Sequence, residues 1–313
     1  MELVMAPMLA ITDDKYRNVY STHFPFFDYS IAPFVSLSDG NKITKRAFAE
    51  LHPGDQKMKI VPQLLNHNQE SFLAGSKFLA DWGYQEINLN LACPAKVVMN
   101  KGRGSGLLNH PDQIDRILDN ICSHLQEQQL SVKIRAGRYN HSEFKNLIPV
   151  LNRYPLTKVV IHARTGVQMY DEHVNLDVIQ DAITDLLAPI TYSGDIFSVE
   201  DYTSLQERFP SINSWMLGRG ILINPFLPWL IRGGTKELIC KAKLLAWYRE
   251  LFITLDNYST SDYYVLGRMK NIWQYFHSAF REGDSLLKEL LPLLDKQLFF
   301  EKSYRFLTDN DFK

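Results

Sequence analysis

Short apolar runs recur along this chain at intervals of roughly thirty residues, and this spacing limits the folds it can adopt. The runs occupy residues 3–5, 29–31, 60–64, 87–90, 132–135, 159–162, 190–192 and 215–217. Between most of them lie segments with helical spacing, such as the segment from Pro111, where Ile114, Ile117, Leu118 and Ile121 fall on one face. Short strands that alternate with helices are typical of a parallel sheet.

Eight such strands over about 230 residues match a (β/α)8 barrel, which typically takes about 250 residues. A doubly wound open sheet is the alternative that the spacing leaves open. The chain has 313 residues, 45% of them hydrophobic, so it can fill a large core and still carry an appendage. We therefore expect an α/β chain built on a TIM barrel.

The strand pattern ends after Pro225 and Pro228, and the remaining chain has the spacing of helices. Gly233 and Gly234 form the natural boundary, which predicts a barrel over residues 1–234 and a small all-helical domain over residues 235–313. The apolar positions expected to face the helical core are Leu238, Ala242, Leu245, Tyr248, Val265, Met269, Ile272, Trp273 and Phe276.

Charge and cysteine usage restrict the partners and the compartment. The formal net charge is -1, so any contact with nucleic acid must come from local basic patches. The three cysteines have no short paired spacing, which argues against a zinc site or a disulfide framework and favours a reducing cytoplasm. Asp13 and Asp14 follow the start of the chain closely, and neither a signal peptide nor a membrane-spanning run is expected there.

Polar residues stand at the carboxyl ends of the predicted strands, where barrel enzymes place their active sites. Gln63, Asn90, Lys133 and His162 each lie at or just beyond the carboxyl end of a predicted strand. The loops after the last two strands, residues 193–195 and 218–220, contain Gly and Arg, which suit a phosphate site because glycine lets backbone approach the anion and arginine can grip it. Ordinary β-to-α turns, which also favour glycine, are the alternative reading.

Cys93 follows one of these strands and is itself followed by Pro94, which ends the strand. The next segment, residues 100–106, is basic and rich in glycine, which predicts an active-site loop with the backbone freedom of a lid. A small buried residue at the end of a strand is the alternative for this cysteine.

Taken in order, these residues resemble the tRNA-dihydrouridine synthases, a family of FMN-dependent barrels with a C-terminal helical RNA-binding domain. The resemblance rests on the set rather than on any one piece. The matching segments are residues 5–8, 12–13, 63–64, 90–94, 96, 102–104, 132–137, 162–165, 170, 193–196, 217–220 and 267–273.

The resemblance implies that NADPH reduces FMN, and that the reduced flavin and a general acid then convert a uridine of tRNA to dihydrouridine. Cys93 matches the family's acid, and a thiol with a pKa of about 8.5 stays mostly protonated near pH 7. The expected cofactor-binding residues are Pro7, Met8, Gln63, Asn90, Lys133, His162, Ser193, Gly194, Asp195, Gly218 and Arg219. The expected substrate or RNA contacts are Asn90, Lys96, Lys101, Arg103, Arg164, Tyr170, Arg268 and Lys270.

The chain also departs from the family pattern. Asn88 stands where an acidic residue is usual, Ala92 and Ala163 replace glycines that we expect beside the flavin, and Ser193 replaces asparagine. Pro33 stands where many members carry glutamate. We expect an active, divergent, monomeric and cytoplasmic enzyme without a metal. Two alternatives remain: a flavin reductase of a small unsaturated substrate, and an RNA-binding relative without activity.

Overall fold

A computed structural model describes residues 1–37, 45–66, 68–125, 128–236 and 239–313 of the chain. Its parallel strands form one sheet in the order β3-β2-β1-β9-β8-β7-β6-β5-β4. The strands are β1 (Glu2–Met5), β2 (Tyr29–Ile31), β3 (Ile60–Val61), β4 (Gln63–Leu64), β5 (Glu86–Leu91), β6 (Gln129–Arg135), β7 (Lys158–His162), β8 (Ile190–Ser193) and β9 (Ser214–Leu217).

The sheet closes on itself through Pro62. This residue lies between β3, which pairs with β2, and β4, which pairs with β5. Proline has no backbone N–H, so it interrupts the ladder and divides a single barrel strand into two short ones. The predicted (β/α)8 barrel is confirmed, and the open-sheet alternative is wrong.

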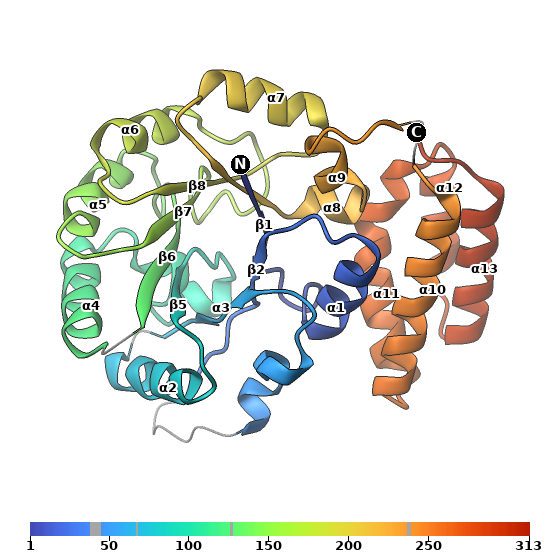
Figure 1. Cartoon of the computed structure of the whole chain (residues 1–313), viewed down its shortest axis with the longest axis horizontal. Helices are drawn as coiled ribbons and strands as arrows, with labels where there is room; N and C mark the ends of the chain where they lie inside the picture. Colours follow the sequence, from blue (N-terminus) through green and yellow to red (C-terminus); the bar gives the residue numbers. More distant parts are fainter. Residues whose placement is uncertain (38–44, 67, 126–127, 237–238) are drawn as a thin grey trace.

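Helices surround the barrel as the spacing predicted (Figure 1). The main ones are α1 (Asp14–His23), α2 (Gln69–Asp81), α4 (Pro111–His124), α5 (Glu143–Leu151), α6 (Asp177–Asp185) and α7 (Val199–Arg208). Shorter helices are α3 (Lys96–Met99), α8 (Arg219–Ile223) and α9 (Leu227–Ile231), and 3-10 turns are η1 (Lys45–Leu51), η2 (Pro53–Asp55), η3 (Gly104–Leu107) and η5 (His277–Ala279).

Helix α4 illustrates how local sequence fixes an element. Pro111 occupies its first turn, where a missing N–H costs nothing, and the predicted face of Ile114, Ile117, Leu118 and Ile121 is buried. That face covers the barrel sheet, and the opposite face, which carries charged residues, meets solvent. No helix in the described part of the chain is long and apolar enough to cross a membrane.

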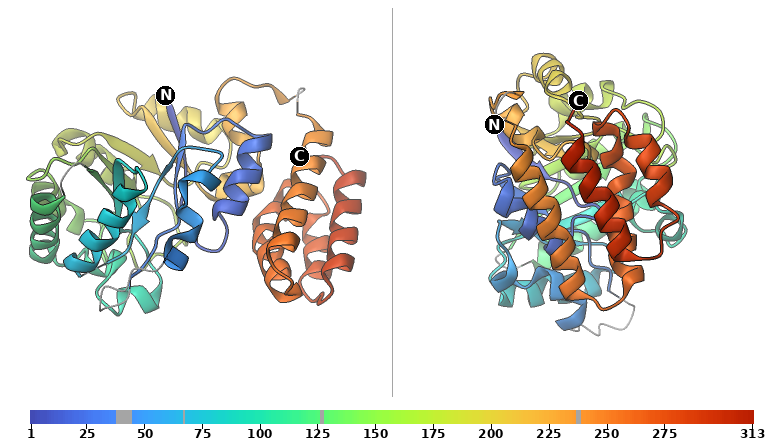
Figure 2. Two further views of the ribbon diagram at one scale, coloured as in Figure 1. Left: turned by 60° about the horizontal axis from the view of Figure 1, so that its bottom comes forward. Right: turned by 90° about the vertical axis from the view of Figure 1, so that its right-hand side faces the viewer.

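Four helices after the barrel form a bundle, α10 (Lys241–Tyr258), α11 (Asp262–Phe276), α12 (Gly283–Leu290) and α13 (Lys296–Asp309). The bundle stands beside the barrel, with α10 packed on α1 and α11 on α8 (Figures 1 and 2). Trp273 is fully buried, and its Nε1 donates to the Tyr248 hydroxyl at 2.8 Å. The division at Gly234 stays a prediction.

The predicted apolar face of α11 is confirmed, because Val265, Met269, Ile272, Trp273 and Phe276 are all buried. The face predicted for the preceding helix is only partly right. Ala242 is exposed and Leu245 half-buried, while Tyr248 is buried; Leu238 lies outside the described residues. The helix begins at Lys241, and the positions that reach the core follow from the way it lies on α1. They are Leu244, Trp247, Tyr248, Leu251, Phe252 and Leu255.

Candidate active site

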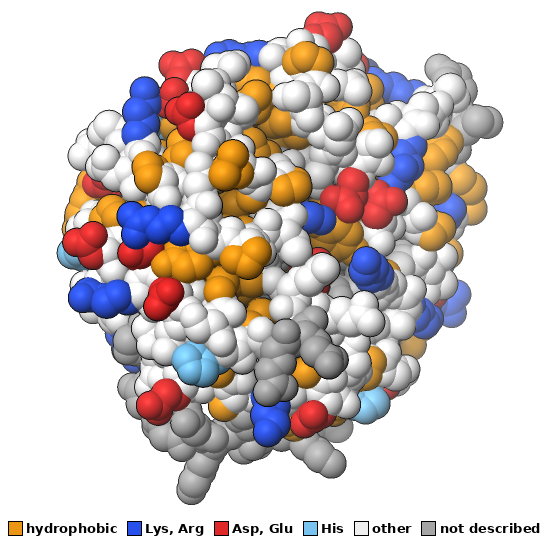
Figure 3. All heavy atoms as spheres, turned by 60° about the vertical axis from the view of Figure 1, so that its left-hand side comes forward, with side chains coloured by type: hydrophobic (Ala, Val, Ile, Leu, Met, Phe, Trp, Pro, Cys, Tyr) orange, Lys and Arg blue, Asp and Glu red, His pale blue; other side chains and the backbone are white. Residues whose placement is uncertain are grey.

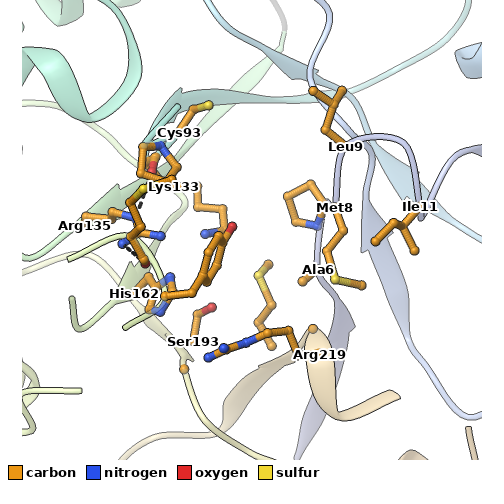
Figure 4. Close-up of a pocket in the computed structure, with 18 of the residues that line it drawn as sticks. Ala6, Met8, Leu9, Ile11, Cys93, Lys133, Arg135, His162, Ser193 and Arg219 are labelled. Atoms are coloured by element: carbon orange, nitrogen blue, oxygen red, sulfur yellow. Dashed lines mark hydrogen bonds between the residues drawn. The ribbon is translucent and has the colours of Figure 1, made fainter. Parts of the chain in front are cut away.

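A cavity of about 350 Å³ opens at the carboxyl ends of the barrel strands. Its two sides differ in chemistry (Figure 4). One side is apolar and comes from the β1–α1 loop, with Ala6, Met8, Leu9 and Ile11. The opposite side carries nitrogen-bearing side chains. These are Lys133 and Arg135 from β6 and His162 from β7. Arg219, from the start of α8, extends into the cavity between the two sides (Figure 4). Pro7, Asn90, Cys93, Ser193, Gly194, Asp195 and Gly218 also line the cavity.

Hydrogen bonds from neighbouring side chains and backbone hold the backbone of the Cys93 loop in place. Asn90 Oδ1 accepts the backbone N–H groups of Ala92 and Cys93, each at 2.9 Å. The Cys93 carbonyl accepts the Ser105 N–H at 3.1 Å and its hydroxyl at 2.9 Å. A Cβ on Gly104, whose φ is +55°, would lie 2.8 Å from that carbonyl. Glycine therefore permits close packing against the cysteine here, rather than the lid freedom that we expected.

Burial raises the pKa of the Cys93 thiol above its ordinary value, although the nearby Arg135 and Lys133 act in the opposite direction. The thiol is therefore protonated at neutral pH. A protonated thiol at the edge of a cavity can donate a proton to a substrate atom.

Lys133 is buried, and no residue in the described part of the chain accepts a hydrogen bond from its amine. Burial, and then repulsion by Arg135, lower its pKa to about 7. Burial, and then repulsion by Arg135 and Lys133, hold the pKa of His162 well below its ordinary value. The ring is therefore neutral. Arg164 Nη1 lies 3.3 Å from His162 Nε2. Because guanidinium only donates, Nε2 accepts and Nδ1 carries the ring proton.

Asp195 joins two arginines at the end of the cavity formed by the last two strands. Its carboxylate accepts from Arg164 at 2.8 and 2.5 Å and from Arg219 at 2.7 Å. Gly194 has a φ of +143° and Asp195 a φ of +35°, so the backbone turns sharply at this point. Arg164 also donates to the carbonyls of Asp171 and Glu172, and it is only 2% exposed. The structure thus gives Arg164 intramolecular partners in place of the expected substrate contact.

Arg135 is a site residue that we did not single out from the sequence. It donates to the Ala92 carbonyl at 3.0 Å and to the Thr165 and Met169 carbonyls at 2.9 and 2.6 Å, so it links the Cys93 loop to the loop after β7. Tyr170 lies on that second loop, 50% exposed, with its ring 5.2 Å from the guanidinium of Arg135. The signal was present in the sequence, because alternate residues of a strand share a face and Arg135 is two residues after Lys133.

Gln63 does not line the cavity, although we expected it to contact the cofactor. It is fully buried, where it accepts from Asn90 Nδ2 and donates to Asn88 Oδ1, both at 2.7 Å. Asn88 in turn donates to the Ser131 hydroxyl at 3.0 Å. An amide at position 88 can both accept and donate hydrogen bonds, which a carboxylate cannot. This departure from the family pattern therefore completes a network of uncharged, hydrogen-bonded side chains beneath the Cys93 loop.

Positive charge is in excess around the cavity. Among the described residues that line it are the cations Lys133, Arg135 and Arg219 and the carboxylate of Asp195. An anion would relieve the repulsion that lowers the pKa values of Lys133 and His162. The apolar side suits a flat ring, and the sharp turn at Gly194 suits a phosphate. The residues present therefore fit a phosphate-bearing, planar cofactor.

Comparison with known proteins identifies the family. The model of dihydrouridine synthase (Dus) matches residues 4–289. The chain belongs to the dihydrouridine synthase family. The tRNA-dihydrouridine(16) synthase of Neisseria meningitidis serogroup B is 25% identical over 304 residues, covering 94% of this chain and 91% of that protein. A probable tRNA-dihydrouridine synthase of Staphylococcus epidermidis is 32% identical over 236 residues, covering 71% and 69%.

Solved structures support the fold. The old yellow enzyme from Trypanosoma cruzi aligns with a TM-score of 0.54 and 9% identity, covering 74% of this chain and 88% of that one. At this identity the likeness shows a shared TIM barrel and nothing about the substrate.

The two alanines that replace family glycines lie in different environments. Ala163 is fully buried, packs in the apolar core and does not line the cavity, so its methyl group does not crowd a cofactor there. Ala92 does line the cavity. Of the two changes that we expected beside the flavin, the structure places one at the cavity.

The cations expected to bind RNA fall into two groups, those that are exposed and those with partners inside the protein. Lys96 and Lys101 are exposed on the Cys93 loop, and Arg103 is half-buried, with Nη1 3.3 Å from the Ser36 hydroxyl. Arg268 is buried in an ion pair with Asp13, and Lys270 donates to the Leu293 carbonyl at 2.6 Å. The two cations from the helical domain thus have partners within the protein, which the family motif alone did not indicate.

Proposed function

We propose that this protein is a flavin-dependent tRNA-dihydrouridine synthase, which uses NADPH and FMN to reduce the carbon–carbon double bond of a uridine in tRNA. The observation that carries the proposal is that a protonated Cys93 thiol and the buried Lys133 amine line the same cavity. Family membership supports it, as do the names of the relatives in Neisseria and Staphylococcus. We further propose that the enzyme acts as a monomer in the cytoplasm and needs no metal.

Bound FMN would supply the hydride that the uracil ring accepts. Lys133 and neutral His162 would face the ring of the cofactor, where a cation and an N–H donor stabilise negative charge. Gly194, Gly218 and Arg219 would hold the phosphate. Asp195 would keep Arg219 oriented, since it already accepts a hydrogen bond from that guanidinium.

Cys93 would complete the reduction as the general acid. The thiol would give its proton to the carbon next to the one that receives the hydride, so that a C–H bond forms and the S–H bond breaks. The resulting thiolate regains a proton from solvent before the next turnover. Asn90 and Ser105 would keep the thiol in place by holding the backbone on both sides of it.

The target base must leave its stack within the folded RNA to reach this cavity, which costs a few kcal/mol. Exposed apolar side chains at the cavity, such as Leu9 at 65%, suit contact with an unstacked base. Nearby, Lys96 and Lys101 would bind phosphates. On the face shown in Figure 3, cationic and acidic side chains are intermixed around apolar ones, which agrees with RNA contact through local groups.

The visible absorption spectrum of the purified protein tests the proposal. We expect a flavin spectrum that bleaches with NADPH and recovers when unmodified tRNA is added, with dihydrouridine appearing at one mapped position. Bleaching that a small enone reverses and tRNA does not would indicate a reductase of small substrates. A protein that binds tRNA but cannot be loaded with FMN would contradict the proposal and indicate an RNA-binding relative.

Replacing Cys93 tests the acid. We expect Cys93→Ala to keep its flavin spectrum and to slow single-turnover reduction of uridine in tRNA by about 10²–10⁴-fold, the usual contribution of a general acid. Reduction of the flavin by NADPH should be unchanged, because that step needs no proton from Cys93. Full single-turnover activity of Cys93→Ala would exclude this residue as the acid.

A further inference from the structure

The apolar side of the cavity is a loop of the barrel that contacts the helical domain. The β1–α1 loop, residues 6–12, lines the cavity with five of its residues: Ala6, Pro7, Met8, Leu9 and Ile11. Within this loop, Ala10 has a φ of +60°, a left-handed backbone conformation that residues other than glycine rarely adopt. Such a backbone persists when its surroundings fix it, so the contacts of this loop matter for the shape of the cavity.

The loop is folded by its own hydrogen bonds. Thr12 accepts the Met8 N–H at 2.8 Å through its hydroxyl, which also donates to the Ala6 carbonyl at 3.0 Å. The N–H groups of Ile11 and Thr12 donate to the Met8 carbonyl at 3.0 and 2.9 Å. These bonds make the loop compact, but they do not by themselves attach it to the rest of the molecule.

Arg268 of α11 provides that attachment. Its Nη2 donates to the Ile11 carbonyl at 3.0 Å, and its Nη1 pairs with Asp13. Both side chains are buried, Arg268 at 7% exposure and Asp13 at 3%. The second carboxylate oxygen of Asp13 accepts the Tyr16 N–H at 3.1 Å and so caps α1. One guanidinium from the helical domain therefore fixes both the end of the loop and the start of α1.

The same helix reaches the cavity directly. Tyr275 follows Arg268 by seven residues, which is close to two helical turns, so the two side chains lie on the same side of α11. Tyr275 lines the cavity together with the β1–α1 loop. The helical domain thus contributes Tyr275 to the cavity and holds the loop that provides others.

Other charged groups surround this contact. Carboxylate oxygens of Asp13, Asp14 and Glu50 lie within 4.8 Å of one another. Arg17 is fully buried beside them and donates to the Thr12 carbonyl at 2.8 Å. These acidic groups therefore lie beside two buried arginines, whose positive charge attracts them.

We propose that Arg268 and Asp13 are positioning residues for the reaction, which shape the flavin cavity by fixing the β1–α1 loop, and that Arg268 is not an RNA contact. This inference rests on the proposed function for its link to the flavin. The position of the loop itself can be measured in the protein without any ligand.

The experiment compares hydrogen exchange at the amides of Met8, Ile11 and Thr12 in the ligand-free, full-length protein. We expect Arg268→Met to speed exchange at these amides at least tenfold. Asp13→Asn should do the same, although asparagine keeps the α1 cap. Arg268→Lys should restore part of the protection, since lysine can pair with Asp13 but lacks the second arm that reaches the Ile11 carbonyl. As a control, Lys296→Met removes ion pairs with Asp256 and Asp262 inside the bundle and should leave these amides within twofold of the wild type.

Titrations with FMN and tRNA complete the test. We expect Arg268→Met and Asp13→Asn each to weaken FMN binding at least tenfold, with the double variant no more than threefold worse than either, because the two residues act as a unit. Unchanged exchange and FMN affinity in Arg268→Met, with tRNA binding weakened tenfold, would overturn the inference and return Arg268 to the RNA surface. A wild-type protein that takes up no FMN would contradict the proposed function, and the exchange measurement would still decide whether Arg268 holds the loop.

Discussion

The barrel cavity and the contact between barrel and bundle both bury cationic side chains, but they neutralise them differently. At the contact, Arg268 meets a carboxylate and a backbone carbonyl inside the protein. In the cavity, the described lining residues include Lys133, Arg135 and Arg219 against the carboxylate of Asp195. The pKa values follow this difference. Asp13 raises the pKa of Arg268 against the effect of burial, while burial and the neighbouring Arg135 lower the pKa of Lys133.

This difference separates structural from functional charge. A buried cation with a partner in the chain holds two segments together, and removing either partner is costly. A buried cation without one lowers stability and is kept where a ligand supplies the missing charge. By this criterion, we propose that Lys133 binds a ligand and that Arg268 has a structural role, although the family pattern includes both.

Replacing Lys133 should have the largest effect of the changes considered. We expect Lys133→Met to slow NADPH-dependent reduction of the bound flavin by about 10²–10³-fold, as for the loss of one preorganised charged group. The ligand-free variant should unfold at the same temperature as the wild type or higher, since no partner is lost. Stopped-flow absorbance and thermal denaturation measure the two effects. A clear fall in stability would mean that Lys133 has a structural role like that of Arg268.

Asp195→Asn tests the one carboxylate among the described lining residues. Asparagine keeps the shape and tolerates the left-handed backbone, but it cannot neutralise Arg164 and Arg219. We expect the free energy of unfolding in urea to fall by about 2 kcal/mol, less than for a fully buried pair because this carboxylate is partly exposed. An unchanged free energy would indicate that the two arginines are neutralised in another way.

The pH dependence follows from Lys133. In the ligand-free protein its pKa is lowered to about 7, so from there up to the unfolded value of about 10.4 the unfolded chain binds one more proton than the folded one. This group therefore makes stability rise with pH across that window, and the gain is lost as pH falls towards 7. Since an anion prefers the protonated amine, FMN affinity should fall up to about tenfold per pH unit above 7. Lys133→Met should flatten both profiles; equally steep profiles in that variant would assign them to another group.

The smallest effect distinguishes exposed cations from those with internal partners. We expect Lys101→Ala to reduce the slope of log affinity for tRNA against log salt by about 0.7–0.9, the contribution of one phosphate contact. Lys270→Ala should instead lower stability by about 1 kcal/mol through loss of its bond to the Leu293 carbonyl and leave the slope unchanged. The opposite pattern would place Lys270 on the RNA surface and Lys101 away from it.

The sequence predicted the barrel correctly because strand spacing, strand-end polar residues and the helical face of α4 are local or periodic signals. The sequence predicted less where one side chain can form hydrogen bonds with several different partners. Gln63 lies in the short strand β4 near the site, yet its amide forms hydrogen bonds with Asn88 and Asn90 beneath the site. Arg135 was overlooked, although it stands two residues from Lys133 on the same strand.

By itself, the sequence determined the parallel barrel, the helical tail and the group of residues at the strand ends, since hydrophobic periodicity dictates which faces are buried and parallel strands bring their ends together. Only the tertiary structure decided which cations face a cavity and which are neutralised. Arg268 and Asp13 are separated by 255 positions in the chain, and their pairing depends on how α11 packs against the barrel. Spacing along a sequence carries no information about that distance, because the free energy of a buried charge depends on what surrounds it in space.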